Sequence, residues 1–145
     1  MPEKLLQEIK EIDSVEAVAV ISFKGNIWQQ SGATVTAEQM KMIGSYLLRM
    51  LAIKSKSKQR IVHIELHWLN RFLIARFSEG FLIVTLFKKA DILSLLRITL
   101  NVTVANLLEE KTFLKWLKKE KYNLNLHIQK GQFDEHELGL ISKLV

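Results

Sequence analysis

The chain of 145 residues contains no cysteine, a single proline and only six glycines. Without cysteine it can form no disulfide, no thiolate nucleophile and no cysteine-ligated zinc site. No apolar run approaches the roughly 20 residues that a membrane helix needs. The N-terminal stretch MPEKLLQEIK is charged and amphipathic, unlike a signal peptide. We therefore expect a cytoplasmic protein with the size of one ordinary domain.

Patterns that carry enzyme chemistry are also missing. No serine stands in a nucleophile-elbow context, and no Ser/His/Asp arrangement is legible. Gly25 and Gly32 are too far apart for a phosphate-binding loop and lack the lysine-serine pair that follows one. The adjacent carboxylates at 109–110 and 134–135 are typical of helix ends. We predict a protein that is not an enzyme and has no cofactor.

The composition is that of a soluble globular protein, with 48% apolar residues, 25% charged residues and a net charge of +6. The positive charge gathers in the segment KSKSKQR, residues 54–60, and in a second lysine cluster at 111–121. Such clusters are either solvated faces or binding sites for nucleic acid, anionic lipid or an acidic protein. The first cluster has no interleaved aromatics, so we do not expect nucleic acid to be a partner.

Residues 60–87 are the most regular part of the sequence. Val62, Ile64, Leu66 and Trp68 alternate with polar residues, which is strand periodicity. Two short interruptions, at 69–71 and 79–80, divide the segment into three strands that neighbour one another as an antiparallel meander. The last strand, FLIVTLF, has little polar alternation, so we expect both of its faces to be covered.

The first third of the chain predicts a helix followed by two strands. Apolar residues recur at helical spacing up to Ile12, and the helix should end near 13–14. Residues 15–23 are typical of a buried strand, and Lys24-Gly25-Asn26 of a turn. Residues 27–30 are more polar and predict a returning edge strand.

A central helix is predicted from a cap at Thr34 or Thr36 to about Lys54, and it carries two apolar stripes. The first stripe consists of Met40, Ile43, Leu47, Leu48 and Leu51. The second consists of Met42, Tyr46, Met50 and Ile53. One stripe can lie on the sheet, whereas the second needs another cover. Either the helix is fully buried in a larger domain, or it pairs with its own copy in a homodimer.

The last part of the sequence predicts further helices. Asp91 is a plausible cap for a long helix to about Glu110, which also carries two stripes. One stripe consists of Leu93, Leu96, Leu100, Val104 and Leu107, and the other of Ile92, Leu95, Ile98 and Val102. A short basic helix follows, then a possible strand at 124–129 and a terminal helix at 134–145. We expect one domain at 1–110 and a C-terminal extension at 111–145 packed on or beside it.

This order of elements resembles the roadblock/dynein-light-chain family, which includes the bacterial MglB-like proteins. The likeness spans about residues 3–110. It rests on the opening helix, on a valine-rich strand at Val15-Glu16-Ala17-Val18-Ala19-Val20 and on the turn Lys24-Gly25-Asn26-Ile27. Lys24 replaces the aspartate that is commoner in the family, and the extension beyond 111 is not part of the family pattern.

The resemblance implies an α+β fold with a five-stranded antiparallel sheet in the order 2-1-5-4-3. The first and last core helices would cover one face and the central helix the other. It also implies a homodimer in which central helices pair and edge strands join, and which serves as a scaffold or regulator for a small Ras-like GTPase. The dimer interface would then include Met42, Tyr46, Met50, Ile53, His63, Glu65 and His67. The polar sector Glu38, Lys41, Ser45 and Arg49 would receive the GTPase.

Two other uses of these residues stay open. His63, Glu65 and His67 lie two apart on one strand face, where two such side chains can converge on a metal ion. An ordinary polar strand face explains the same pattern, and we predict no metal. The basic helix with Lys115, Trp116, Lys118 and Lys119 could instead dock on acidic lipid or another polyanion with Trp116 inserted. That gives the alternative function of a membrane or polyanion adaptor.

Overall fold

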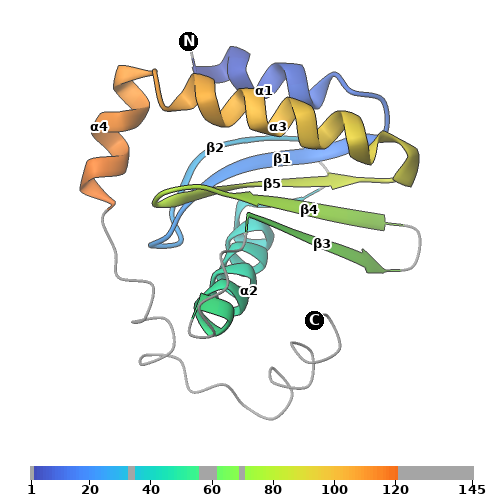
Figure 1. The fold of residues 1–145 in the computed structure, drawn as a ribbon, viewed down its shortest axis with the longest axis horizontal. Helices are drawn as coiled ribbons and strands as arrows, with labels where there is room; N and C mark the ends of the chain where they lie inside the picture. The colour runs from blue at the N-terminus through green and yellow to red at the C-terminus, as the bar shows by residue number, and fades with distance from the viewer. Residues whose placement is uncertain (1, 33–34, 56–61, 69–70, 121–145) are drawn as a thin grey trace.

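The computed structural model of the chain describes residues 2–32, 35–55, 62–68 and 71–120 (Figure 1). The helices in order are α1 (Pro2–Lys10), α2 (Ala37–Ser55), the short 3-10 helix η1 (Ala90–Ile92), α3 (Leu93–Leu107) and α4 (Lys111–Lys119). The strands are β1 (Val15–Ser22), β2 (Ile27–Ser31), β3 (His63–Trp68), β4 (Arg71–Phe77) and β5 (Phe81–Phe87). The strand predicted at 124–129 and the helix predicted at 134–145 lie outside the described residues.

The strands form one five-stranded antiparallel sheet in the order β2-β1-β5-β4-β3. This confirms the α+β fold and the predicted strand order. β3, β4 and β5 form the expected meander, with β2 and β3 at the two edges. All seven residues of β5 are buried, as its lack of polar alternation indicated. A central strand with both faces covered loses its solvated side, which is why FLIVTLF is apolar almost throughout.

The sheet is covered on both faces, and each face has its own apolar core. On one face, α1, α3 and α4 pack over Val18, Val20 and Ile83. On the other face, α2 alone packs over Ala17, Ala19 and Val84. Figure 1 shows α1 and α3 side by side on one side of the sheet and α2 on the opposite side. The division follows from strand geometry, because neighbouring residues of β1 point to opposite faces.

α2 begins where the sequence provides a complete cap. The Gln39 N–H donates to Thr36 Oγ1 at 3.1 Å, and the Thr36 N–H donates to Gln39 Oε1 at 2.9 Å. This reciprocal pair is a capping box, so Thr36 is the capping residue of the two threonines considered. Further along, Gly44 lets the helix approach β1 closely, since a Cβ at that position would lie 2.8 Å from Ile21 Cδ1.

The start of α3 differs from the prediction that Asp91 caps it. Residues 90–92 form η1, whose N-cap is Lys89, and no side chain caps either η1 or α3. Asp91 instead lies exposed inside the first turn, where its charge still complements the helix N-terminus. The hydroxyls of Thr99 and Thr103 donate to the carbonyls of Leu95 and Thr99, each at 2.8 Å. These bonds explain how a helix rich in β-branched residues accommodates its threonines.

α4 turns from the α3 side of the sheet and closes one end of the core. Phe113 is fully buried, with its ring 4.9 Å from the rings of both Trp28 and Phe81. At the end of α4, Asn26 Nδ2 donates to the two carboxylate oxygens of Glu120 at 2.9 and 3.1 Å. The first part of the extension therefore packs on the domain. The division of the chain into a domain at 1–110 and an extension at 111–145 stays a prediction.

Candidate partner-binding surfaces

The outer side of α2 exposes part of the predicted second stripe. Met42 is 59% exposed and Tyr46 is 39% exposed, which is unusual for large apolar side chains. Ile53 is half-buried, and Met50 is only 3% exposed. Met50 therefore contributes no free surface in the single chain, in contrast to the expectation that the whole stripe needed an outside cover. The apolar surface that α2 offers is the Met42–Tyr46 half of the stripe.

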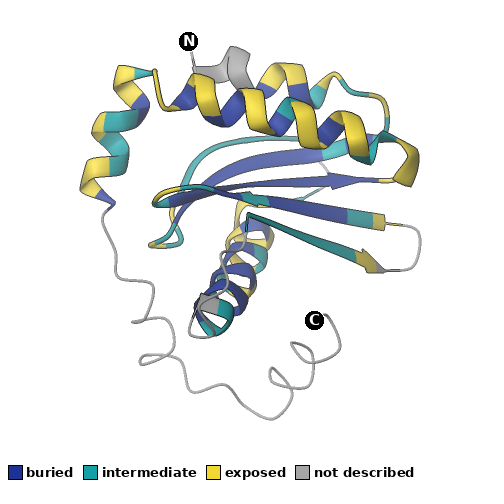
Figure 2. Ribbon diagram, viewed as in Figure 1, coloured by how far each residue is buried: buried dark blue, intermediate teal, exposed yellow. Residues whose placement is uncertain are grey.

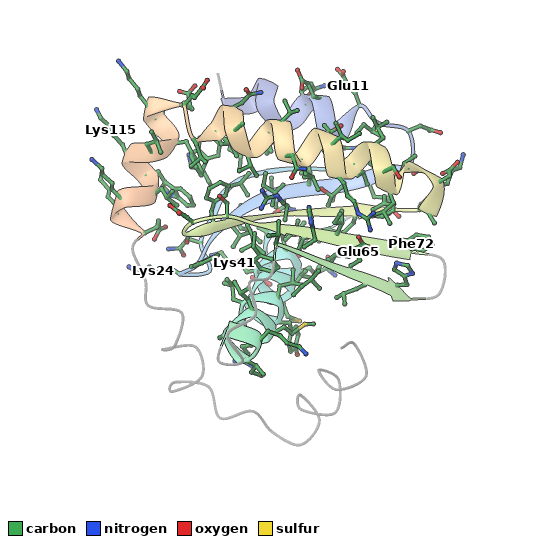
Figure 3. All side chains as sticks on the ribbon, in the orientation of Figure 1. Glu11, Lys24, Lys41, Glu65, Phe72 and Lys115 are labelled. Carbon is green, nitrogen blue, oxygen red and sulfur yellow. The ribbon has the colours of Figure 1, made fainter. Side chains whose placement is uncertain are left out.

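The polar sector of α2 lies along the same helix. Glu38 and Lys41 are exposed, whereas Ser45 and Arg49 are half-buried. In Figure 3, Lys41 lies on α2 close to the sheet. The sector thus offers one acidic and one basic side chain beside the exposed Met42, which is a mixed polar and apolar surface of the kind seen at protein interfaces.

The three predicted side chains on β3 lie on the face of the sheet that α3 covers. Glu65 accepts a hydrogen bond from Arg97 Nε of α3 at 2.9 Å, and Arg97 NH2 also contacts it. The His67 ring packs edge-on against Phe72 with centroids 4.8 Å apart. These side chains therefore already have contacts inside the chain. What β3 offers to a second copy is mainly the unpaired backbone of a sheet edge.

Two guanidinium groups and one carboxylate lie near His63. Burial, together with the nearby Arg76 and Arg97 guanidinium groups, lowers the pKa of His63 below 6.5, and Glu65 opposes that shift. Arg76 itself is held by Asn101 of α3, its Nε donating to Oδ1 at 2.9 Å. In the described part of the chain, no three His, Cys, Asp or Glu side chains are placed to hold a metal ion. The arrangement favours the ordinary polar strand face over a metal site.

α4 presents a basic outer face and an apolar inner face. Lys111, Lys115, Lys118 and Lys119 are exposed, and Figure 3 shows Lys115 pointing away from the sheet. Trp116 is half-buried, with its ring 6.2 Å from Trp28 and 5.8 Å from Phe113. Trp116 thus packs against the core in part, and its insertion into acidic lipid stays a prediction. Any attraction of the lysines to an acidic partner would be electrostatic.

The outer side of α3 is a surface that the sequence analysis did not select. Its second stripe was recognised, but no function was assigned to it. Leu95, Ile98, Val102 and Leu108 are 51%, 64%, 48% and 42% exposed. The same apolar residues give residues 90–107 a mean hydropathy of 1.3, enough by length and composition for a membrane span. The sequence analysis, which considered only unbroken apolar runs, did not identify this segment. Because the opposite stripe packs on the chain's own sheet, we treat α3 as an amphipathic surface helix.

A shallow hollow of about 400 Å³ lies between α1 and the edge strand β2. Its lining is uncharged and consists of Leu6, Gln7, Gln29, Gln30 and Ser31. Gln30 Nε2 donates to the Val35 carbonyl at 2.8 Å and so joins β2 to the segment before α2. Among its described lining residues, no side chain is suited to act as a general acid or base.

Comparisons with solved structures identify the fold. A roadblock/LC7 domain from Streptomyces avermitilis matches with a TM-score of 0.56 and 12% identity, over 74% of this chain and 91% of its own. MglB from Myxococcus xanthus matches with a TM-score of 0.61 and 12% identity, over 79% of this chain and 84% of its own. The gliding protein MglB from Thermus thermophilus matches with a TM-score of 0.58 and 13% identity, over 70% of this chain and 82% of its own. No protein-family model and no curated protein matches the sequence. The chain has the roadblock fold of these structures.

Proposed function

We propose, from the roadblock fold of this chain, that it is a homodimeric scaffold that binds a small Ras-like GTPase in the cytoplasm and modulates its GTP hydrolysis. The observation that carries the proposal is the exposure of Met42 and Tyr46 on the outer side of α2. A helix whose other side is already committed to the sheet gains from covering such residues with a second copy.

The geometry of α2 supports a symmetric pair. In a two-fold dimer the same patch meets itself, so Met42 and Tyr46 of one protomer would cover those of the other. β3 lies at the sheet edge, and its backbone is free to pair with a second β3. An exposed sheet edge is otherwise a liability for uncontrolled association. Both features are covered at once if central helices and edge strands form one continuous interface.

The GTPase would dock on the polar sector formed by Glu38, Lys41, Ser45 and Arg49. Among the described residues we find no group arranged for nucleophilic or acid–base catalysis, so the module would act on the conformation of the GTPase. One solved structure with a TM-score of 0.61 and 12% identity is described as MglB with a tetrameric arrangement, which supports self-association of this fold in kind.

The dimer is tested by Tyr46→Glu, which would bury a carboxylate in the helix pair. Light scattering should show the mass of the native protein halved by this change. Leu95→Glu is the matched control, because it places the same charge on an exposed apolar position of α3. A Tyr46→Glu protein that keeps the native mass would refute the α2 interface.

The GTPase is tested by affinity capture from the native extract, with GTP-loaded and GDP-loaded samples compared. We expect a Ras-like GTPase to be recovered in one nucleotide state, and recovery to fall when Glu38 and Lys41 are exchanged by Glu38→Lys and Lys41→Glu. Because the exchange leaves the net charge of the protein unchanged, a fall in recovery could not be caused by a change in overall charge. Unchanged recovery by the exchanged protein would exclude this sector as the docking site.

A second candidate function is binding to an anionic membrane through the outer face of α4. Four exposed lysines favour it, since each basic residue near an acidic bilayer contributes about 1 kcal/mol. Flotation with phosphatidylserine vesicles should then be lost on changing Lys115, Lys118 and Lys119 to glutamate. It should also be abolished by salt if the lysines of α4 supply the whole attraction. Flotation that resists salt would contradict this electrostatic mode.

A further inference from the structure

The outer side of α3 carries an apolar seam that the proposed GTPase module does not use. We define the seam as Leu95, Ile98, Val102 and Ala105, which are all exposed (Figure 2). They follow one another at intervals of three, four and three residues, the spacing with which one helix presents a continuous stripe to another. At 1.5 Å per residue the seam is about 16 Å long, or three helical turns.

Neither packing among the described residues nor helix propensity accounts for the seam. The sheet is contacted by a different stripe, in which Leu96, Leu100 and Val104 are buried. Ile98 and Val102 are β-branched, so at exposed helical positions they cost stability relative to alanine. Contiguous exposed apolar residues on a helix that is already anchored mark an interaction surface.

The surroundings of the seam are acidic although the chain is basic overall. Asp91 lies four residues before Leu95, and Glu109 four residues after Ala105, and both carboxylates are exposed. Glu8 on the neighbouring α1 and Glu11 directly after it are exposed as well, and Figure 3 shows Glu11 at the outer surface of the layer. Between the two ends, residues 98–108 contain no charged side chain.

Three basic residues near the seam have contacts of their own. Lys89 Nζ lies 3.5 Å from the Asp13 carboxylate, and Lys10 Nζ donates to the Val15 carbonyl at 3.3 Å. Arg97 is turned toward β3, where it is paired with Glu65. The uncharged stretch 98–108 thus has the exposed carboxylates of Asp91 and Glu109 in line with the two ends of the seam, and those of Glu8 and Glu11 on the side of α1.

We propose that the seam docks an amphipathic helix of a second protein, with apolar residues at heptad spacing over about three turns and lysine or arginine at its ends. A second copy docked antiparallel through the same seam would place Asp91 against Glu109 at both ends. The chain's own segment 134–145 carries Asp134, Glu135 and Glu137. An anionic membrane would face Glu8 and Glu11. Charge complementarity therefore selects a basic helix.

Two synthetic helical peptides test the proposal. Both carry leucine at the heptad core positions over three turns, and their ends and flanks carry either lysine or glutamate. Binding to the full-length protein is measured by fluorescence anisotropy. We expect the lysine peptide to bind about tenfold more tightly than the glutamate peptide. Ile98→Asp should abolish binding, while Met42→Asp on α2 should leave it unchanged. Asp91→Lys combined with Glu109→Lys should reverse the preference between peptides.

Several results would overturn the proposal. Equal binding of the two peptides would show that charge does not select the occupant, and binding that survives Ile98→Asp would place it elsewhere. A lower mass of Ile98→Asp in light scattering would identify a second copy as the occupant. Tighter peptide binding by an Ile141→Asp chain would identify the C-terminal segment. Loss of vesicle flotation by Ile98→Asp would identify lipid. None of these results depends on the Tyr46→Glu test of the α2 dimer.

Discussion

The two helical layers of this molecule cover the same sheet in different ways. On one face α2 is the single helix among the described residues that packs on the sheet, and of its described large apolar residues Met42 and Tyr46 are exposed. On the other face α1, α3 and α4 pack together on the sheet, and α3 exposes three large apolar residues, with an exposed Leu108 directly after it. The sequence analysis selected α2 as the helix that needs a partner, yet α2 is better covered than α3.

The difference shows what an apolar stripe can and cannot reveal. Both α2 and α3 have two stripes in the sequence, and in both one stripe packs on the sheet. In α2 the second stripe contains the buried Met50, whereas in α3 the residues Leu95, Ile98 and Val102 of the second stripe are all exposed. Stripe position is a property of the helix alone, but exposure depends on which other segments pack against it.

The largest expected effect is on the packing of α4 against the α3 side of the sheet. Phe113→Ala removes a fully buried ring that contacts Trp28 and Phe81. Such truncations cost about 3–5 kcal/mol of unfolding free energy, which urea denaturation measures. Lys115→Ala, on the exposed side of the same helix, should change stability by no more than about 0.5 kcal/mol. A small effect of Phe113→Ala would mean that α4 does not belong to the α3 layer.

The next effect tests how closely α2 lies on the sheet. Gly44→Val places a branched side chain where even a Cβ would lie 2.8 Å from Ile21 Cδ1. Overpacking of this kind costs about 1–3 kcal/mol, measured as a lower denaturation midpoint. Lys41→Val puts the same side chain on the exposed side of α2 and reports the propensity cost alone. Equal effects of the two changes would show that α2 tolerates displacement from β1.

The fold was largely predictable from the sequence, and the reason is physical. Alternation at Val62, Ile64 and Leu66, and its loss in FLIVTLF, depend only on which faces of a strand are wet. The burial of Met50 and Phe113 was not predictable, because both depend on contacts between segments distant in sequence. Asp91 was assigned as a cap because of its residue type, yet the chain enters α3 through η1 and no side-chain cap forms. Periodicity identifies apolar faces but not their covers.

A smaller effect concerns the start of α2. Thr36→Ala removes the hydroxyl that accepts the Gln39 N–H and so breaks half of the capping box. The cost should be about 1 kcal/mol, seen as a lower thermal midpoint. Thr36→Ser keeps the acceptor and should keep most of the stability. If alanine and serine behave alike at this position, the cap does not stabilise the α2 layer. α3, which has no side-chain cap, offers no equivalent position.

The smallest effect is a pH dependence that belongs to the α3 side of the sheet. The pKa of His63 is lowered in the folded chain by burial and by Arg76 and Arg97. Its Nε2 is buried and makes no hydrogen bond with a described residue. Between the folded pKa and 6.5 the unfolded chain binds more protons, so the free energy of unfolding should rise with pH across that window. Above 6.5 both states hold the neutral ring, and the contribution of His63 should vanish.

The measurement is urea denaturation of the native protein at a series of pH values around and below 6.5. The loss of stability on acidification should be smaller in His63→Gln, which keeps a polar side chain at the same strand position but has no titratable ring. His67→Gln, further along β3 and exposed, serves as the control for removing a histidine from this edge. An identical pH profile in His63→Gln and the native protein would show that burial and the guanidinium groups of Arg76 and Arg97 do not lower the pKa of this ring. The acid sensitivity would then have to arise elsewhere, and the distinction between the two layers would be one of packing alone.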